Sequence, residues 1–489
     1  MKKANFCYAV LTASAVLTLG TVFSASAAQW QALGDEWVYV QNDGEYFKDG
    51  WKQDGNLYYY LGSDGIMLRR TLIEDDDNYY YLGSSGAMAT NVWKFIQNPE
   101  WQGDELVGEG SWYYFGSNGK AIKSDGSKAK VYEVGDKKYV FDHYGRMMSG
   151  WVTESGEYVE SEDDWANGLY YADGDGDGSV VTNAWVYTTV PDDTNEDETE
   201  PTYHFYFGSN GKKTVSTKKS IGGKEYFFDE RGVAQYGWKQ DDNSEWMYYG
   251  DSEEPYLRTG WFQAVPAEAM NSSGHEDGSV YWYYATSAGK IAVSEFRTID
   301  GKTYAFNGNG ELVTGLKRMT VDPADKKKIT AIASVDYISD IEGNLESQDT
   351  YVCYFGGDGA AKTGTQTLTI DGSSYTFDFK SNGSPKGAGT NGINDNYLYV
   401  NGRRLAAEDG SKYQTVDFTD PKGEKSGEYL VNESGAVQKN KRNVKDADGY
   451  YYCTDSKGHY FTILWMTSVL KSIRSKAENN KIPAQNKVF

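Results

Sequence analysis

Short apolar runs alternate with polar turns along most of the chain, and glycine marks almost every turn. In the stretch GWKQDGNLYYYLGSDG, residues 50–65, a run that contains Trp51 is followed by a polar Gly turn and by three consecutive tyrosines. Runs of this length, rich in aromatic side chains and bounded by Gly-containing turns, predict β-strands joined in hairpins. Long aliphatic runs at helical spacing are scarce, so the pattern does not favour helices.

The same unit recurs many times. It consists of a strand that contains Gly-Trp, a polar turn, an aromatic strand and a second Gly turn, which gives a repeat of roughly 20 residues. Gly-Trp or a related Asn-x-Trp occurs at Trp51, Trp93, Trp151, Trp185, Trp238 and Trp261, and weakens to Gly-Leu at Leu316. We therefore predict an all-β fold, an elongated β-hairpin solenoid of tandem repeats that covers residues 29–460.

The composition suggests how such repeats are stabilised. The chain contains 41 Tyr, 14 Trp and 19 Phe but also 55 Gly. A single hairpin is not stable in water, whereas stacked hairpins cover one another's faces. Because one Trp or Tyr buries about 150–250 Å², we expect the aromatic side chains to replace the missing aliphatic core.

Four insertions interrupt the repeats, after Trp93, Trp185, Trp261 and Leu316. Each follows a Gly-Trp or Gly-Leu strand and precedes an aromatic strand, so we expect all four to leave the repeats from equivalent hairpin tips. Such loops are candidate docking sites for protein partners. The insertion after Leu316 has about 30 residues, too few for an independent active-site domain.

The two ends depart from the repeat. Lys2 and Lys3, an apolar run over residues 8–23 and the small residues Ala25 and Ala27 predict a secretory signal peptide over residues 1–28. The alternative is an uncleaved anchor, although the run is short for a membrane span. We therefore expect a secreted protein, associated with the cell surface or cell wall, without a transmembrane anchor. Residues 461–489 form a C-terminal tail to which no role is assigned.

Charge and cysteine content exclude several classes. The formal net charge of −23 argues against nucleic acid and anionic lipid as partners, since both require a basic surface. It suits cationic ligands, or simply keeps a secreted protein soluble. Cys7 is lost with the signal peptide, and the distant Cys353 and Cys453 are expected to be buried small hydrophobes rather than a disulfide.

The chain shows no motif of an enzyme or of a cofactor site. No nucleophile elbow, Gly-rich phosphate loop or HExxH occurs, so we predict a non-catalytic protein without cofactors. One candidate metal site is the acidic stretch with Asp173, Asp175 and Asp177, whose spacing suits calcium. Ala184 stands where a bidentate Glu is expected, and the alternative is a flexible acidic hairpin turn.

The stretches GWKQDGNLYYYLGSDGIM and GSSGAMATNVW resemble the choline-binding, or cell-wall-binding, repeat of Gram-positive surface proteins. Related repeats occur in the glucan-binding domains of streptococcal glucosyltransferases and in the C-terminal repeats of clostridial toxins. The resemblance covers roughly residues 30–460 and is clearest from 46 to 315. In the choline-binding family, the ligand lies between successive hairpins in a cage of three aromatic rings. The Gly-Trp ring and the first aromatic of the next strand come from one repeat, and a Tyr of the following repeat closes the cage.

The resemblance implies specific cage residues in this chain. The best match is Trp238 with Trp246, closed by Tyr283 or Tyr284; the others are Trp261 with Trp282, closed by Tyr304, Trp93 with Trp112, closed by Tyr139, and Trp51 with Tyr58. Three positions depart from the family pattern. At Trp51, Leu57 occupies the usual Trp position, and at Trp151 a long insertion separates the ring from Tyr170. Trp185 faces His204 or Phe205.

The implied partner is a choline-bearing teichoic acid or a similar envelope polymer. Two alternatives remain open. A stripe of Trp and Tyr in a solenoid is also needed for packing, so a cage need not hold a ligand. The same scaffold can also bind a glucan or host glycan, with Tyr and Trp as flat platforms for sugar rings.

Overall fold

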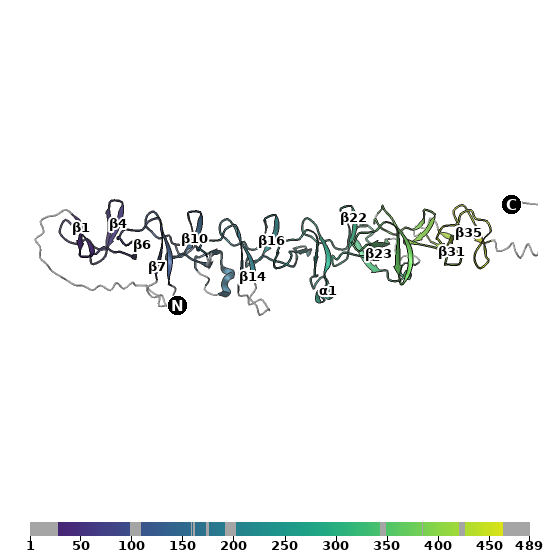
Figure 1. The fold of residues 1–489 in the computed structure, drawn as a ribbon, viewed down its shortest axis with the longest axis horizontal. Helices are drawn as coiled ribbons and strands as arrows, with labels where there is room; N and C mark the ends of the chain where they lie inside the picture. The colour runs from purple at the N-terminus through teal and green to yellow at the C-terminus, as the bar shows by residue number, and fades with distance from the viewer. Residues whose placement is uncertain are drawn as a thin grey trace, which may run out of the picture. The chain divides into compact units, whose positions relative to one another are not determined.

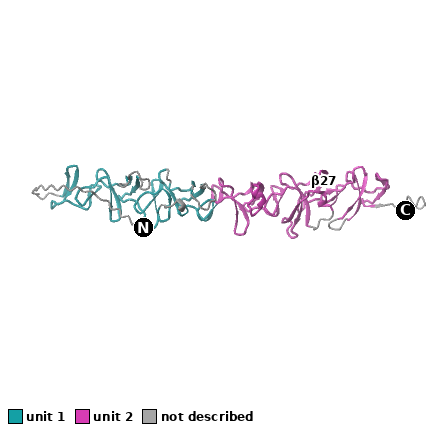
Figure 2. Ribbon diagram, turned by 90° about the horizontal axis from the view of Figure 1, so that it is seen from below, with its two compact units in different colours: residues 1–219, 227–234 teal, residues 220–226, 235–489 magenta. Residues whose placement is uncertain are grey.

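The structure is a computed structural model that describes residues 28–97, 109–157, 159, 162–172, 176–190, 202–342, 349–383, 385–419 and 426–462. The chain divides into two compact units, shown in different colours in Figure 2. Unit 1 comprises residues 1–219 and 227–234, and unit 2 comprises residues 220–226 and 235–489. The chain passes from one unit to the other within strands β15 (Thr217–Ile221) and β16 (Lys224–Phe228).

Unit 1 is a series of two-stranded antiparallel hairpins that follow one another along the chain (Figure 1). The paired strands are β1 (Gln29–Leu33) and β2 (Glu36–Val40), β3 (Gly50–Asp54) and β4 (Leu57–Leu61), β5 (Thr71–Asp75) and β6 (Asn78–Leu82), β7 (Val92–Gln97) and β8 (Gly110–Phe115), β9 (Lys130–Val134) and β10 (Lys137–Phe141), β11 (Gly150–Val152) and β12 (Tyr170–Ala172), and β13 (Ala184–Thr189) and β14 (Thr202–Phe207). A 3-10 helix, η1 (Glu162–Asn167), lies between β11 and β12. The prediction of an all-β fold of tandem hairpins is confirmed.

Unit 2 begins with hairpins of the same kind and continues with larger sheets. The hairpins are β17 (Trp238–Gln240) with β18 (Trp246–Tyr248), β19 (Gly260–Ala264) with β20 (Tyr281–Ala285), and β21 (Glu295–Ile299) with β22 (Lys302–Phe306), and the short helix α1 (Ser272–Glu276) lies between β19 and β20. A three-stranded sheet of order β24-β23-β25 follows, from β23 (Gly315–Val321), β24 (Ile329–Ser334) and β25 (Thr350–Phe355), with the 3-10 helix η2 (Ile338–Ile341).

The last sheets of unit 2 follow the three-stranded one. A five-stranded sheet of order β26-β27-β30-β29-β28 is made by β26 (Gly364–Ile370), β27 (Ser373–Phe379), β28 (Gly392–Asn394), β29 (Tyr397–Val400) and β30 (Arg403–Arg404). The hairpin of β31 (Tyr413–Phe418) and β32 (Gly427–Asn432) comes next, and then the sheet of β33 (Val444–Lys445), β34 (Tyr451–Thr454) and β35 (Tyr460–Thr462).

A tight turn follows the second strand of most hairpins and passes the chain to the next. After β6 the amide of Gly86 donates to the carbonyl of Gly83 at 3.0 Å, and Gly86 has a φ of +83°. A Cβ on Gly86 would lie 2.6 Å from Cε of Met67, the residue two positions after the preceding turn glycine. Gly is therefore required here both by backbone conformation and by the packing of successive turns.

The core differs from the one that the sequence suggests. The last residue of most second strands is completely buried, and these positions hold Phe, Leu or Ala: Leu61, Leu82, Phe115, Phe141, Ala172, Phe207, Phe228, Ala285 and Phe306. Among the tryptophans that the structure describes, only Trp165 is buried. The expectation that aromatic side chains form the core thus holds for Phe, while Trp side chains such as Trp238 and Trp261 pack against the buried clusters and stay partly exposed.

The insertions are not all loops at hairpin tips. The insertion after Trp261 contains α1, capped by Asn271, whose side chain accepts from the amide of Gly274 at 3.1 Å. The insertion after Leu316 forms β24, which pairs with β23 on the side opposite to β25. This insertion leaves from the tip between β23 and β25, as expected, but it does not remain a loop, because Ile329 and the part-buried Ile332 gain burial by adding a strand to the sheet. Residues 98–108 and 191–201 of the first two insertions lie outside the described residues.

The structure confirms one of the other predictions from the sequence and leaves several untested. Cys353 and Cys453 are buried free thiols, as predicted, and burial raises the pKa of Cys353 to about 12. Within the described ranges, no helix has the length and apolar character needed to cross a membrane. The signal peptide, up to residue 27, and the tail from residue 463 lie outside the described residues, and the boundaries of the repeat domain stay a prediction.

Candidate aromatic-cage binding sites

The hairpin of β3 and β4 places two rings on one face and receives a third from the next hairpin. Trp51 lies opposite Tyr60 in the register, and Tyr58 lies opposite Gln53, two positions further along. Residues two apart on a strand share a face, so Trp51 and Tyr58 are diagonal neighbours. The ring of Tyr80 from β6 stands 4.9 Å from that of Trp51 at an interplanar angle of 67°. Tyr80 is buried, whereas Tyr58 is exposed.

The same perpendicular pair recurs at two further hairpins. The ring centroids of Trp93 and Tyr139 lie 4.8 Å apart at 67°, and those of Trp261 and Tyr304 lie 4.9 Å apart at 68°. The diagonal neighbours are Trp112 and Trp282, which are 44% and 46% exposed. Packing alone does not require a large ring to stay half in solvent. Each group therefore offers an inner corner of two rings and an outer ring open to solvent.

The Trp238 group is the most enclosed of the four. Trp246 stands 6.3 Å from Trp238 at 89°, and Tyr283 stands 4.8 Å away at 68°. Of the two closing residues considered from the sequence, the structure brings Tyr283 against Trp238, while Tyr284 lies opposite Trp261 in the neighbouring hairpin. The buried Tyr283 hydroxyl has no hydrogen-bond partner in the described chain.

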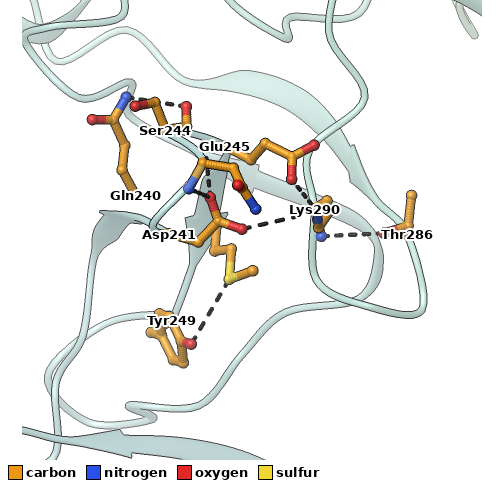
Figure 3. Close-up of polar contacts among 9 residues, drawn as sticks. Gln240, Asp241, Ser244, Glu245, Tyr249, Thr286 and Lys290 are labelled. Atoms are coloured by element: carbon orange, nitrogen blue, oxygen red, sulfur yellow. Dashed lines mark hydrogen bonds and ion pairs between the residues drawn. The ribbon is translucent and has the colours of Figure 1, made fainter.

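Neighbouring side chains add further walls and a rim to this group. Phe262 stacks on Tyr283 at 5.7 Å, and Met270 of the insertion packs against the same cluster. At the rim, Lys290 of the following turn reaches back to the carboxylates of Glu245 and Asp241 in the β17–β18 turn (Figure 3). This ion-pair cluster links the turn between β17 and β18 to the turn that follows β20.

Each group also receives a backbone hydrogen bond from the same position in the turn that follows its closing strand. This is the residue two positions after the turn glycine, and its amide donates to the carbonyl of the outer ring residue. The donor and acceptor pairs are Met88 to Tyr58 at 2.8 Å, Met147 to Trp112 at 2.7 Å, Ile291 to Trp246 at 3.0 Å and Leu312 to Trp282 at 2.9 Å. We call this the floor position. It holds an apolar residue in all four groups.

In the Trp51 and Trp93 groups, a carboxylate is within hydrogen-bond distance of a cage ring's polar atom. Asp75 accepts a hydrogen bond from Nε1 of Trp51 at 3.0 Å, and Asp177 lies 3.4 Å from the Tyr139 hydroxyl. Burial, followed by the charge of Asp75, raises the pKa of Tyr80, and burial followed by Asp177 raises that of Tyr139. The phenols therefore stay neutral at physiological pH, and the nearby carboxylates favour a cationic ligand.

The Trp185 and Trp151 groups, which depart from the family pattern in sequence, also differ from the other groups in structure. Trp185 lies opposite Tyr206, and His204 lies opposite Tyr187 with the two rings 4.5 Å apart. Burial lowers the pKa of His204, so this site presents a neutral imidazole. At Trp151, whose strand partner is Tyr171, the 3-10 helix η1 supplies an additional ring, Trp165.

Sequence reasoning missed one complete group and one closing residue. Trp30 lies 5.3 Å from Tyr59 at 69°, and Trp37 is the exposed diagonal neighbour. Gln29 rather than Gly precedes Trp30, so the Gly-Trp search passed over it; the Trp-x6-Trp spacing was the available signal. Tyr80, which closes the Trp51 group, is the second of three consecutive tyrosines in β6.

The calcium hypothesis is not decided by the structure. Asp173 and Asp175 lie outside the described residues. Asp177 forms an ion pair with Lys137 at 2.5 Å and accepts from the amide of Ser179 at 3.1 Å. Among the described residues, no cluster of three or more His, Cys, Asp or Glu side chains is arranged to hold a metal ion.

Known proteins share the repeats of this chain. Residues 49–93 match the choline-binding repeat family, and residues 107–121 match the family of cell wall binding repeats. Glucosyltransferase-S of Streptococcus mutans serotype c is 28% identical over 265 residues, which cover 53% of this chain and 14% of that protein. Glucosyltransferase-I of Streptococcus downei is 24% identical over 265 residues, 42% of this chain and 16% of that protein. The chain thus spans less than a fifth of these relatives.

Similar solved structures include two from Streptococcus pneumoniae. Choline binding protein F is 20% identical, with 70% of this chain and 98% of that chain covered and a TM-score of 0.36. The modular autolysin LytC is 22% identical, with 60% of this chain and 54% of that chain covered and a TM-score of 0.36. The family matches fall on the hairpins that carry the Trp51 and Trp93 groups. The chain thus carries choline-binding, or cell-wall-binding, repeats in these hairpins.

Proposed function

We propose that this protein attaches without catalysis to a choline-bearing teichoic acid, or a similar polymer, of the bacterial envelope. The observation that carries the proposal is the repeated perpendicular Trp–Tyr corner with a half-exposed third ring, at Trp51, Trp93 and Trp261. A quaternary ammonium group seated in such a corner meets the faces of several rings and needs no charged partner.

The energetics favour a polymer over free choline. Each desolvated ring contributes about 0.5–2 kcal/mol of cation–π attraction, so a single cage binds its ligand weakly. Several cages on one chain bind a polymer with many choline groups by avidity. The net charge of −23 adds a favourable potential for cationic groups. This function places the protein on the outer surface of the cell, where choline-binding repeat proteins are typically found.

A glucan-binding role is the second candidate function. It is favoured by the similarity to two streptococcal glucosyltransferases. The half-exposed rings of Trp112 and Trp282 are flat platforms on which a sugar ring can stack. Unlike choline binding, this function does not require the inner corner of two perpendicular rings.

Retention on immobilised polymers separates the two functions. The full chain is applied to beads with choline-bearing teichoic acid, with choline-free teichoic acid and with dextran. We expect retention on the first beads only, and elution by free choline. The variant Trp282→Ala should elute at lower choline concentration, while Tyr450→Ala, which removes an exposed ring outside the cages, should behave as the wild type. Retention on dextran that choline does not reverse would support the glucan function instead.

A further inference from the structure

The Trp151 site differs from the other groups in its outer ring. Leu169, not an aromatic residue, precedes Tyr170 and Tyr171 of β12 at the usual position of that ring. The ring of Trp165 from η1 lies 6.5 Å from Trp151, and Phe205 of β14 closes the site at 5.0 Å and 76°. Trp165 and Phe205 are buried. The insertion therefore rebuilds a three-ring cage that the strand sequence alone has lost.

A lysine of the same unit occupies this cage. Nζ of Lys213 lies 5.0 Å from the ring centroid of Trp151, and 5.8 Å from those of both Trp165 and Phe205. It donates a hydrogen bond to the carbonyl of Ala166 at 2.9 Å. Lys213 is only 5% exposed. Within the described chain, no carboxylate oxygen lies at ion-pair distance from this ammonium, so the rings and one carbonyl hold the charge.

The repeat register puts Lys213 there. Lys213 stands at the floor position, two residues after Gly211, and its amide donates to the carbonyl of Leu169 at 2.8 Å. Met88 and Met147 hold the equivalent position in the Trp51 and Trp93 groups. Both kinds of side chain run over the next turn glycine: the end of Met88 packs on Gly119, and the methylenes of Lys213 pack on Gly232. A lysine is longer than a methionine by its ammonium group, and that group enters the cage.

The insertion is shaped to fit against this cage. Gly168, which follows η1, lies so close to Trp151 that a Cβ there would meet the indole at 2.7 Å. The amide of Gly168 donates to the carbonyl of Trp165 at 3.0 Å and closes the end of η1. The Trp165 ring and the Ala166 carbonyl thereby approach Lys213 from one element, while Trp151 and Phe205 approach from two hairpins.

We infer that Lys213 is a built-in ligand of the cage formed by Trp151, Trp165 and Phe205, and that it closes this cage to external quaternary ammonium groups. The inference rests on the proposed function, because it assigns which of its cages are open. A primary ammonium suits this cage better than choline does, since the Ala166 carbonyl accepts a hydrogen bond that a quaternary ammonium cannot donate. Met88 and Met147 carry no such group, so the Trp51 and Trp93 cages stay free for choline.

A reciprocal exchange at the floor position tests the inference. Lys213→Met should open the Trp151 cage, and Met147→Lys should close the Trp93 cage. Isothermal titration of each full-length variant with choline counts the sites. We expect one site more than in the wild type for Lys213→Met and one fewer for Met147→Lys. The matched control is Lys212→Met, which removes an adjacent, more exposed lysine that pairs with Glu154 and should leave the number unchanged.

A second readout does not depend on choline binding. The rings should shift the ε-methylene NMR signals of Lys213 away from those of the other lysines, and choline should leave these signals in place. Trp151→Ala should return them toward ordinary values. If the wild type binds no choline but these shifts are present, the proposed function fails while the built-in ligand stands. Ordinary Lys213 signals, displacement of Lys213 by choline, or a folded Lys213→Met variant without an added site would overturn the inference.

Discussion

The hairpins up to β22 and the region from β23 to β35 use similar strands and turns, but they place their aromatic rings differently. In the hairpins, Trp residues stand in perpendicular pairs and stay partly exposed. From Leu316 to Thr462 the sequence contains no Trp. There Phe377 and Phe379 are buried and stack at 5.8 Å within a cluster whose other buried members are aliphatic. These strands and turns assemble without Trp, whereas in the hairpins Trp238 and Trp261 pack against buried clusters and still keep part of their rings in solvent.

The largest expected effect on stability lies in the region without cages. Phe377→Ala removes a fully buried ring and should lower the free energy of unfolding by about 3–5 kcal/mol. Urea denaturation followed by circular dichroism measures the loss. At urea concentrations where the variant is still folded, choline should bind at the same number of sites as in the wild type. If the variant remained folded but lost choline sites, this region would also contact the ligand, and the difference between the two regions would be contradicted.

The next largest effect is the pH dependence that Lys213 gives to the free energy of unfolding. Burial lowers the pKa of Lys213 from 10.5 to about 8. Between these values the unfolded state binds more protons than the folded state, so this group increases stability as pH rises, by on the order of 3 kcal/mol in total. Asp229, whose charge acts in the opposite sense, and Arg231 are the nearby charged groups. Lys213→Met should remove this increase.

The difference between wild type and variant isolates the contribution of Lys213. The pKa of tyrosines such as Tyr60 is raised in the folded state by burial and by Asp75. Above pH 10 these phenols release protons first in the unfolded chain, so they lower the free energy of unfolding as pH rises. This loss is common to both proteins and cancels. Equal pH dependence of the two unfolding free energies between pH 8 and 10 would show that Lys213 is not buried in the cage.

A smaller effect on affinity is expected when one outer ring is removed. Trp112→Ala should weaken choline binding at the Trp93 cage about 2- to 30-fold, since one cation–π contact of about 0.5–2 kcal/mol is lost. Because this ring is 44% exposed, the free energy of unfolding should change by less than about 1 kcal/mol. Titration calorimetry and urea denaturation of the same sample give both values. A large loss of stability with unchanged affinity would assign the ring to packing.

The smallest effect is expected at the ion pairs between successive hairpins. Lys290 reaches Glu245 and Asp241 across two turns (Figure 3), but exposed pairs contribute little and are screened by salt. Lys290→Met should lower the melting temperature slightly at low salt and not at high salt. A loss that persists in high salt would mean that the Lys290 stem, rather than its charge, holds the neighbouring hairpins together.

The sequence predicts strands and turns well, because glycine spacing and aromatic runs are local signals. The resemblance to choline-binding repeats assigns the rings of the Trp93 and Trp261 groups, and the structure brings Trp93 against Tyr139 and Trp261 against Tyr304. The sequence does not predict burial: Phe115 and Trp112 are both aromatic, yet the strand alternation buries one and exposes the other. Contacts made by insertions are also missed, because Trp165 follows no repeat offset, and neither does β24, which adds a strand where a loop is expected.

Choline titration of the full chain, followed by tryptophan fluorescence, tests the central claim most directly. We predict a saturable change that sodium chloride at equal ionic strength does not produce, and a smaller amplitude with Trp112→Ala and Trp282→Ala. Tyr450→Ala should leave the curve unchanged. No change up to tens of millimolar choline, the weak limit for a single small cage, would contradict the account and assign the exposed Trp rings to another ligand.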